Sequence, residues 1–170
     1  RVISAVASVL LLRNSGDTMQ HVATIDRLVN LLDPAANLIF NMTTEEARVA
    51  VGSGDPDRVR SIDGQFAILH KRGNIVRMAR SLGRPMRYFL AKLVDGPCLI
   101  VAERIEEIAE WLTREELDGQ FHPAYTRMVP AHHITEIALV GCPDPNPVYT
   151  RYFAPERNTL PSDINQIGRQ

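Results

Sequence analysis

A run of basic residues without any acidic residue lies in the middle of the sequence. Between Gly64 and Val94 there are seven lysines and arginines and no aspartate or glutamate. They are Lys71, Arg72, Arg77, Arg80, Arg84, Arg87 and Lys92. Clustered cationic side chains bind phosphates, so this basic run is compatible with a binding site for anionic ligands or nucleic acid. No row of aromatic residues is interleaved for base stacking, and alternation along strands would divide the charges between faces, so the pattern does not favour nucleic acid.

Other residue types that often do chemistry form no catalytic or metal-binding pattern. His132 and His133 are adjacent, so on a strand they point to opposite faces and cannot bind one metal ion together. Cys98 and Cys142 lack metal-ligand spacing and are too few for a disulfide framework, which indicates buried thiols in a reducing, cytoplasmic compartment. The sequence contains no P-loop, no Gly-x-Gly-x-x-Gly and no nucleophile elbow. We therefore predict no catalytic residue, metal or cofactor in this chain itself.

The composition is that of an ordinary globular chain. The 170 residues include 19 basic and 20 acidic side chains, so the formal net charge is -1. This balance excludes a uniformly basic nucleic-acid binder and an acidic disordered tail. No apolar run approaches the ~18 residues of a membrane-spanning helix, so no membrane partner is expected. The predicted organisation is one domain over residues 1–155 and a linker or tail over residues 156–170.

A succession of helices and strands is expected to position these residues. The spacing of apolar residues predicts a helix over 18–32, and Thr43 with Glu46 forms a capping box for a second helix that reaches about Val51. A further helix is predicted after residue 104, and four strands in the middle of the chain are expected to form an antiparallel meander. The expected strands are 2–12, 38–40, 66–70, 74–79, 86–93, 98–102, 134–140 and 149–153. This pattern predicts an α+β layered fold.

Five short motifs, in order along the chain, resemble one family of domains. Residues 62–67 (IDGQFA) resemble the L-D-G-x-F-A strand of class II glutamine amidotransferase domains, and residues 79–89 (ARSLGRPMRYF) are similar to their A-R-D-x-x-G-x-K/R-P-L-Y-Y hairpin. Residues 101–105 (VAERI) resemble F-A-S-E-I, and residues 129–133 (VPAHH) resemble the V-P-P-G-H turn. Residues 152–155 (YFAP) resemble the closing Y-W-x-P of asparagine synthetases. The chain thus resembles the N-terminal domain of asparagine synthetase-like enzymes, which include β-lactam and carbapenam synthetases and lasso-peptide cyclases.

The resemblance implies an Ntn-hydrolase-like fold, in which two antiparallel sheets lie between helices. The family's glutaminase nucleophile is an N-terminal cysteine whose own amine acts as the base. Here the first residues are RVIS, where the family has Cys-Gly-Ile. Residues 40–42 (FNM) are similar to the F-N-G-E segment, whose Asn and Gly help to hold the oxyanion, but Met42 replaces the Gly. The resemblance therefore implies a domain that is degenerate in its glutaminase site.

The function implied is that of a non-catalytic N-terminal domain or subunit of an ATP-dependent, amide-forming ligase. Its partner would be the synthetase domain, which binds ATP and Mg and carries a Ser-Gly-Gly-x-Asp-Ser loop that this chain lacks. The chain would cover that domain, shape its substrate cleft or hold a homodimer. Two alternatives stay open. One is an active amidotransferase domain whose cysteine precedes Arg1, and the other is a stand-alone module that binds anionic ligands on its arginine-rich hairpins.

Six motif residues are expected to determine the fold or a domain interface and to take no part in catalysis. They are Asp63, Gly64, Phe66, Arg80, Gly83 and Pro85. Gly64 and Gly83 are expected at turns or at points where two backbones approach closely. Arg80, if buried, needs a carboxylate or backbone carbonyls around its guanidinium group.

Overall fold

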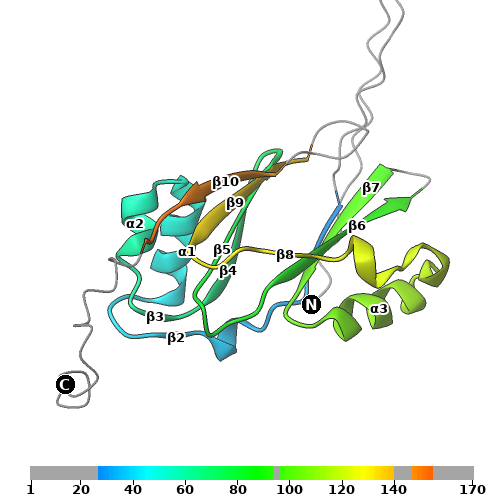
Figure 1. The fold of residues 1–170 in the computed structure, drawn as a ribbon, viewed down its shortest axis with the longest axis horizontal. Helices are drawn as coiled ribbons and strands as arrows, with labels where there is room; N and C mark the ends of the chain where they lie inside the picture. Colours follow the sequence, from blue (N-terminus) through cyan, green and yellow to red (C-terminus); the bar gives the residue numbers. More distant parts are fainter. Residues whose placement is uncertain (1–26, 94–95, 140–146, 155–170) are drawn as a thin grey trace, which may run out of the picture.

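The structure is a computed structural model that describes residues 27–93, 96–139 and 147–154, and over these ranges the chain is α+β, as predicted (Figure 1). The strands are β1 (Arg27–Asn30), β2 (Leu38–Ile39), β3 (Gly64–Gln65), β4 (Ala67–Arg72), β5 (Ile75–Arg80), β6 (Arg87–Leu93), β7 (Gly96–Ala102), β8 (Arg127–Met128), β9 (His133–Ala138) and β10 (Val148–Arg151). The α-helices are α1 (Thr44–Ser53), α2 (Pro56–Arg60) and α3 (Ile105–Arg114). Short 3-10 helices are η1 (Pro34–Ala36), η2 (Asp118–Gln120) and η3 (Pro123–Tyr125).

The described strands form two four-stranded sheets and a two-stranded ribbon. The first sheet has the order β1-β7-β6-β8, and the second has the order β10-β9-β5-β4. The ribbon consists of β2 and β3. Among the described pairs, β1 runs parallel to β7 and every other pair is antiparallel.

The two sheets pack face to face over a shared apolar core. Met78 on β5 and Ile137 on β9 belong to one buried cluster with Tyr88 on β6 and Leu99 on β7. Because successive side chains of a strand point to opposite faces, the neighbours of these residues point outward, toward the helices. The core between the sheets therefore accounts for one face of each sheet.

Helices cover the two outer faces. Val51 of α1 and Val59 of α2 are fully buried in a cluster that includes Ile68 of β4, on the outer face of the second sheet. Ile108 and Leu112 of α3 are fully buried in another cluster, on the outer face of the first sheet. The layers thus run from α1 and α2 through the second sheet and the first sheet to α3 (Figure 1).

The local signals for the helices are confirmed. The Thr43 hydroxyl accepts a hydrogen bond from the Glu46 backbone N–H, and the Glu46 carboxylate accepts one from the Thr43 backbone N–H at 2.8 Å, so the predicted capping box is present. Gly54, at φ 73°, ends α1 in the left-handed conformation. The predicted apolar face of the later helix is the face of α3 that packs on the first sheet.

The predicted helix over 18–32 is wrong where the structure describes it, because residues 27–30 form strand β1. Leu28 packs in the core between the sheets, whereas its neighbour Val29 packs on the α3 side. A strand whose two faces are both covered has consecutive apolar residues. The apolar pair 28–29 fits such a strand as well as it fits one face of a helix, so the sequence pattern does not distinguish the two. The backbone of β1 pairs with β7 in a parallel ladder.

The predicted antiparallel meander is also wrong in its connectivity. β4 pairs with β5 and β6 pairs with β7, as expected, but β5 and β6 belong to different sheets. The segment 81–86 is therefore a crossing between the two sheets and not a hairpin turn. The other predicted strands of the described part are confirmed. The predicted strand over 2–12 and the domain boundary after residue 155 lie outside the described residues and stay predictions.

None of the helices in the described part of the chain combines the length and the apolar character that a bilayer-spanning helix needs.

Candidate functional site

The motif residues Asp63 and Gly64 hold the β2–β3 ribbon. Gly64 has φ 132°, and a Cβ added there would lie 2.0 Å from the Leu38 carbonyl oxygen, so only glycine fits this close approach. The Asp63 carbonyl accepts a hydrogen bond from the Phe40 N–H at 3.0 Å. The Asn41 side chain accepts one from the Asp63 N–H at 2.9 Å and donates another to the Ser61 carbonyl at 2.7 Å. Both ends of the Asn41 amide thus fix the backbone before β3.

Phe66 and the loop after β5 lock the ribbon to the second sheet. Phe66 is buried against Tyr152, and its backbone N–H donates to the Ser81 hydroxyl at 3.0 Å. The Ser81 N–H donates to the Phe66 carbonyl at 2.9 Å. Gly83 packs on the side chain of Gln65, which a Cβ at this position would approach to 3.0 Å. The neighbour of Gly83 is thus a side chain and not a second backbone, and Pro85 lies exposed at the end of the same loop.

Arg80 is a buried cation held by neutral acceptors. Its side chain donates to the carbonyls of Val129 at 2.6 Å, Arg84 at 3.2 Å and Ser81 at 3.3 Å, and it contacts the Met128 sulfur at 3.3 Å. The Tyr152 hydroxyl donates to the Arg80 carbonyl at 2.7 Å. A carboxylate or backbone carbonyls are the expected partners of this guanidinium, and in the structure its oxygen acceptors are backbone carbonyls. Burial lowers the pKa of Arg80 from its usual value, and Arg87 acts in the same direction.

These motif residues support an exposed apolar surface. Phe40 is 76% exposed, Leu82 is 74% exposed and Leu38 is 57% exposed. Leu38 lies opposite Gln65 in the ribbon, and Gly83, next to Leu82, packs on the Gln65 side chain. We call Leu38, Phe40, Gln65, Leu82 and Gly83 the motif face. Sequence reasoning missed this surface, because Leu38, Ile39 and Phe40 are all apolar and their order does not show which side of the strand is uncovered.

The structure separates the arginines of the basic run. Arg77 donates to the Glu136 carboxylate at 2.7 Å and to the Gly52 carbonyl at 2.7 Å, on the α1 side of the second sheet. Arg84 is buried in an ion pair with Glu103, which belongs to the acidic segment 103–118. With Arg80 also buried, three of the seven basic residues are used within the fold. Arg77, Arg80 and Arg84 are therefore not available together for a shared anionic ligand.

His132 and His133 are placed apart, as predicted. His132, at φ 61°, packs edge-on against Phe153 with ring centroids 4.8 Å apart, while a ring nitrogen of His133 lies 2.8 Å from the Ala131 carbonyl. Burial raises the pKa of the Cys98 thiol to about 11, so it stays protonated at neutral pH. Within the described ranges, no three His, Cys, Asp or Glu side chains are grouped in a way that would hold a metal ion.

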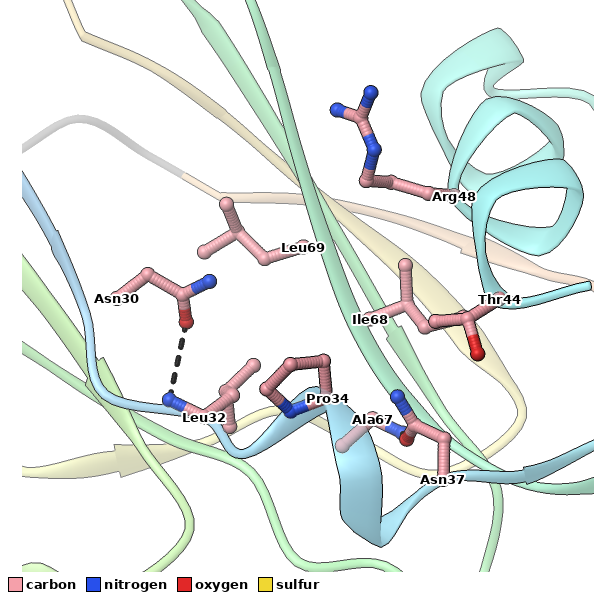
Figure 2. A pocket seen from close by; sticks show the side chains of 9 residues that line it. All are labelled: Asn30, Leu32, Pro34, Asn37, Thr44, Arg48, Ala67, Ile68 and Leu69. Carbon is pink, nitrogen blue, oxygen red and sulfur yellow. Dashed lines mark hydrogen bonds between the residues drawn. The ribbon is translucent and has the colours of Figure 1, made fainter. Parts of the chain in front are cut away.

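A small cavity opens between the end of β1, η1, α1 and the edge strand β4 (Figure 2). Its volume is about 100 Å³, whereas small-molecule sites usually measure roughly 300 to 1,000 Å³. The cavity is lined by Asn30, Leu32, Pro34, Asn37, Thr44, Arg48, Ala67, Ile68 and Leu69. The Asn30 side chain accepts a hydrogen bond from the Leu32 N–H at 3.2 Å, and the Asn37 side chain accepts one from the Ala67 N–H at 2.9 Å.

The cation at the rim of this cavity already has partners. Arg48 donates to the Glu45 carboxylate at 2.6 Å and 2.8 Å, and its guanidinium lies 3.2 Å from His70 Nδ1. Burial lowers the pKa of His70, and the charge of Arg48 lowers it further, so a neutral ring that accepts this hydrogen bond is favoured. The polar groups that line the cavity thus form hydrogen bonds with neighbouring groups of the protein.

A scan against protein-family models, a search of curated proteins and a search of solved structures gave no match to this chain.

Proposed function

We propose that this chain is a non-catalytic, Ntn-hydrolase-like N-terminal domain or subunit of an ATP-dependent, amide-forming ligase similar to asparagine synthetases. The observation that carries the proposal is the motif face. The residues on which the resemblance depends hold a ribbon and a loop that expose Leu38, Phe40 and Leu82. Exposed apolar side chains that lie together mark protein interaction sites. The partner in this proposal is the synthetase domain, which would bind ATP and Mg.

The order of layers supports the same proposal. The resemblance implies two sheets between helices, and the described elements are arranged as helices, sheet, sheet and helix (Figure 1). The motif segments also contact one another in this arrangement. The segment 62–67 enters the second sheet, the segment 79–89 crosses from that sheet to the first, and Val129 and Tyr152 are both bonded to Arg80 through backbone or hydroxyl groups.

One observation supports a domain without glutaminase activity. The resemblance assigns the Asn of the F-N-G-E segment to the oxyanion, but the amide of Asn41 is engaged at both ends by the backbone of residues 61 and 63. In this proposal the amide-forming chemistry belongs to the partner, and this chain contributes a docking surface.

The test changes the motif face and measures association with the synthetase polypeptide recovered with the native protein. In the double variant Phe40→Ser with Leu82→Ser, we expect the Kd to rise at least about tenfold, because buried aromatic and aliphatic anchors dominate interface energies. Both side chains are exposed, so the free energy of unfolding should change by less than about 0.5 kcal/mol.

The matched control is Tyr125→Ser. Tyr125 is 70% exposed but lies in η3, away from the ribbon, so this variant should keep the wild-type affinity. An unchanged affinity in the double variant, with the fold intact, would contradict the proposed docking surface.

A further inference from the structure

Two hydroxyl groups buried between the sheets make no hydrogen bond of normal geometry. Tyr88 on β6 is 6% exposed and Thr135 on β9 is fully buried, and neither Tyr88 Oη nor Thr135 Oγ1 makes such a bond in the described structure, although Tyr149 and Arg127 lie beside the Tyr88 hydroxyl. A buried polar group without a partner is destabilising, so such groups usually indicate a water or a ligand that satisfies them. Both residues face the core shared by the sheets, since Tyr88 belongs to that core and Thr135 lies opposite Met78, which also does.

Strand register places a cation beside Tyr88 in the first sheet and a second phenol beside Thr135 in the second sheet. Arg127 on β8 lies opposite Tyr88, and Tyr149 on β10 lies opposite Thr135. Residues directly opposite each other in an antiparallel pair share a face, so all four side chains start from the inner faces of the two sheets. Tyr149 and Arg127 are both close enough to act on the pKa of Tyr88, which burial raises to about 12, Tyr149 raises further and Arg127 lowers.

The four side chains lie near the solvent-exposed edge of the two sheets, and the described strands that carry them have no acidic residue on the same face. β8 and β10 are edge strands of the two sheets, and Tyr149 is 47% exposed. Among the described residues of β6, β8, β9 and β10, Glu136 is the one acidic residue, and its carboxylate is bonded to Arg77 on the opposite face of the second sheet. A guanidinium and three hydroxyl groups are hydrogen-bond donors suited to the oxygens of an anion.

We propose that Tyr88, Arg127, Thr135 and Tyr149 form a binding site for an oxyanion, a phosphate or carboxylate group, at the open edge between the two sheets. Arg127 and Tyr149 lie at the solvent side of this site, and the hydroxyls of Tyr88 and Thr135 lie at its buried end. The proposal does not depend on the motif face, which is built from β2, β3 and the loop after β5.

The test is thermal unfolding of the full chain with added potassium phosphate or, separately, potassium acetate, with potassium chloride keeping the ionic strength constant. A specific site gives a Tm that rises and saturates with anion concentration, from which Kd follows. We expect at least about a tenfold higher Kd in Arg127→Gln and in Tyr88→Phe, because each loses a donor to the anion. The anion with the lower Kd identifies the group that the site prefers.

Arg114→Gln is the control, because Arg114 is an exposed arginine at the end of α3 and should keep the wild-type Kd. Phosphate also stabilises proteins in general, but that effect does not saturate and would be equal in all variants. An equal, unsaturated rise of Tm in every variant would overturn the proposal. The proposal would also be overturned if the Tyr88→Phe protein had a higher Tm than the wild type in every buffer and its Tm responded to both anions as the wild type does. If Tyr88→Phe does not fold, the exposed Arg127→Gln variant decides.

Discussion

Gly64 shows how one residue in a short motif constrains the backbone around it. Its φ of 132° and its contact with the Leu38 carbonyl leave no space for a side chain. The sequence predicts a close backbone approach at this glycine, and the structure confirms it. The role of Asn41 could not be predicted in the same way, because its partners at residues 61 and 63 become neighbours only when β2 pairs with β3.

We expect Gly64→Ala to lower the free energy of unfolding by about 2 to 4 kcal/mol, because it adds both backbone strain and a clash with a carbonyl oxygen. Urea unfolding measures this difference. The matched control is Gly73→Ala, since Gly73 also has a positive φ, of 57°, but no atom within 4 Å of an added Cβ. The control should lose only about 1 to 2 kcal/mol. Equal losses in the two variants would contradict the close approach at Gly64.

At the scale of elements, local signals predicted α1, α3 and the β4–β5 and β6–β7 hairpins, but neither α2 nor the way in which the hairpins join. The capping box at Thr43 and the apolar face of α3 depend on residues three or four positions apart, which the sequence displays directly. Strand β1 was mistaken for a helix because burial of both its faces depends on layers formed much later in the chain. The assignment of β5 and β6 to different sheets likewise depends on pairing partners, β9 and β8, that are distant in sequence.

Arg80 joins these elements, because its guanidinium at the end of β5 holds the carbonyls of Arg84 in the crossing and of Val129 beyond β8. We expect Arg80→Ala to lower the free energy of unfolding by about 2 to 3 kcal/mol, since it leaves buried carbonyls without a donor. Arg104→Ala is the control, because Arg104 is 69% exposed and its pair with Glu107 spans one helical turn. Its loss should stay below about 0.5 kcal/mol. Denaturant unfolding of both variants compares them, and an unchanged Arg80→Ala protein would contradict this role.

At the scale of the whole molecule, the α+β class follows from the order of helical and alternating patterns, and the structure confirms it. The stacking of the two sheets could not be predicted from those patterns. Alternation shows that a strand has two different faces, but it does not show which element covers each face. The same reason explains why the candidate surfaces were missed. The motif face and the polar site between the sheet edges are assembled from segments that are far apart in sequence.

We propose that this chain supports an amide-forming synthetase without hydrolysing glutamine itself. The most direct measurement is native purification from the source cells, with the intact mass of every polypeptide recovered. The account predicts that the chain is recovered as the front of a longer polypeptide, or in complex with a second one, that carries a Ser-Gly-Gly-x-Asp-Ser loop. Recovery of the chain alone, or of a form in which a cysteine begins the mature chain ahead of Arg1, would contradict it.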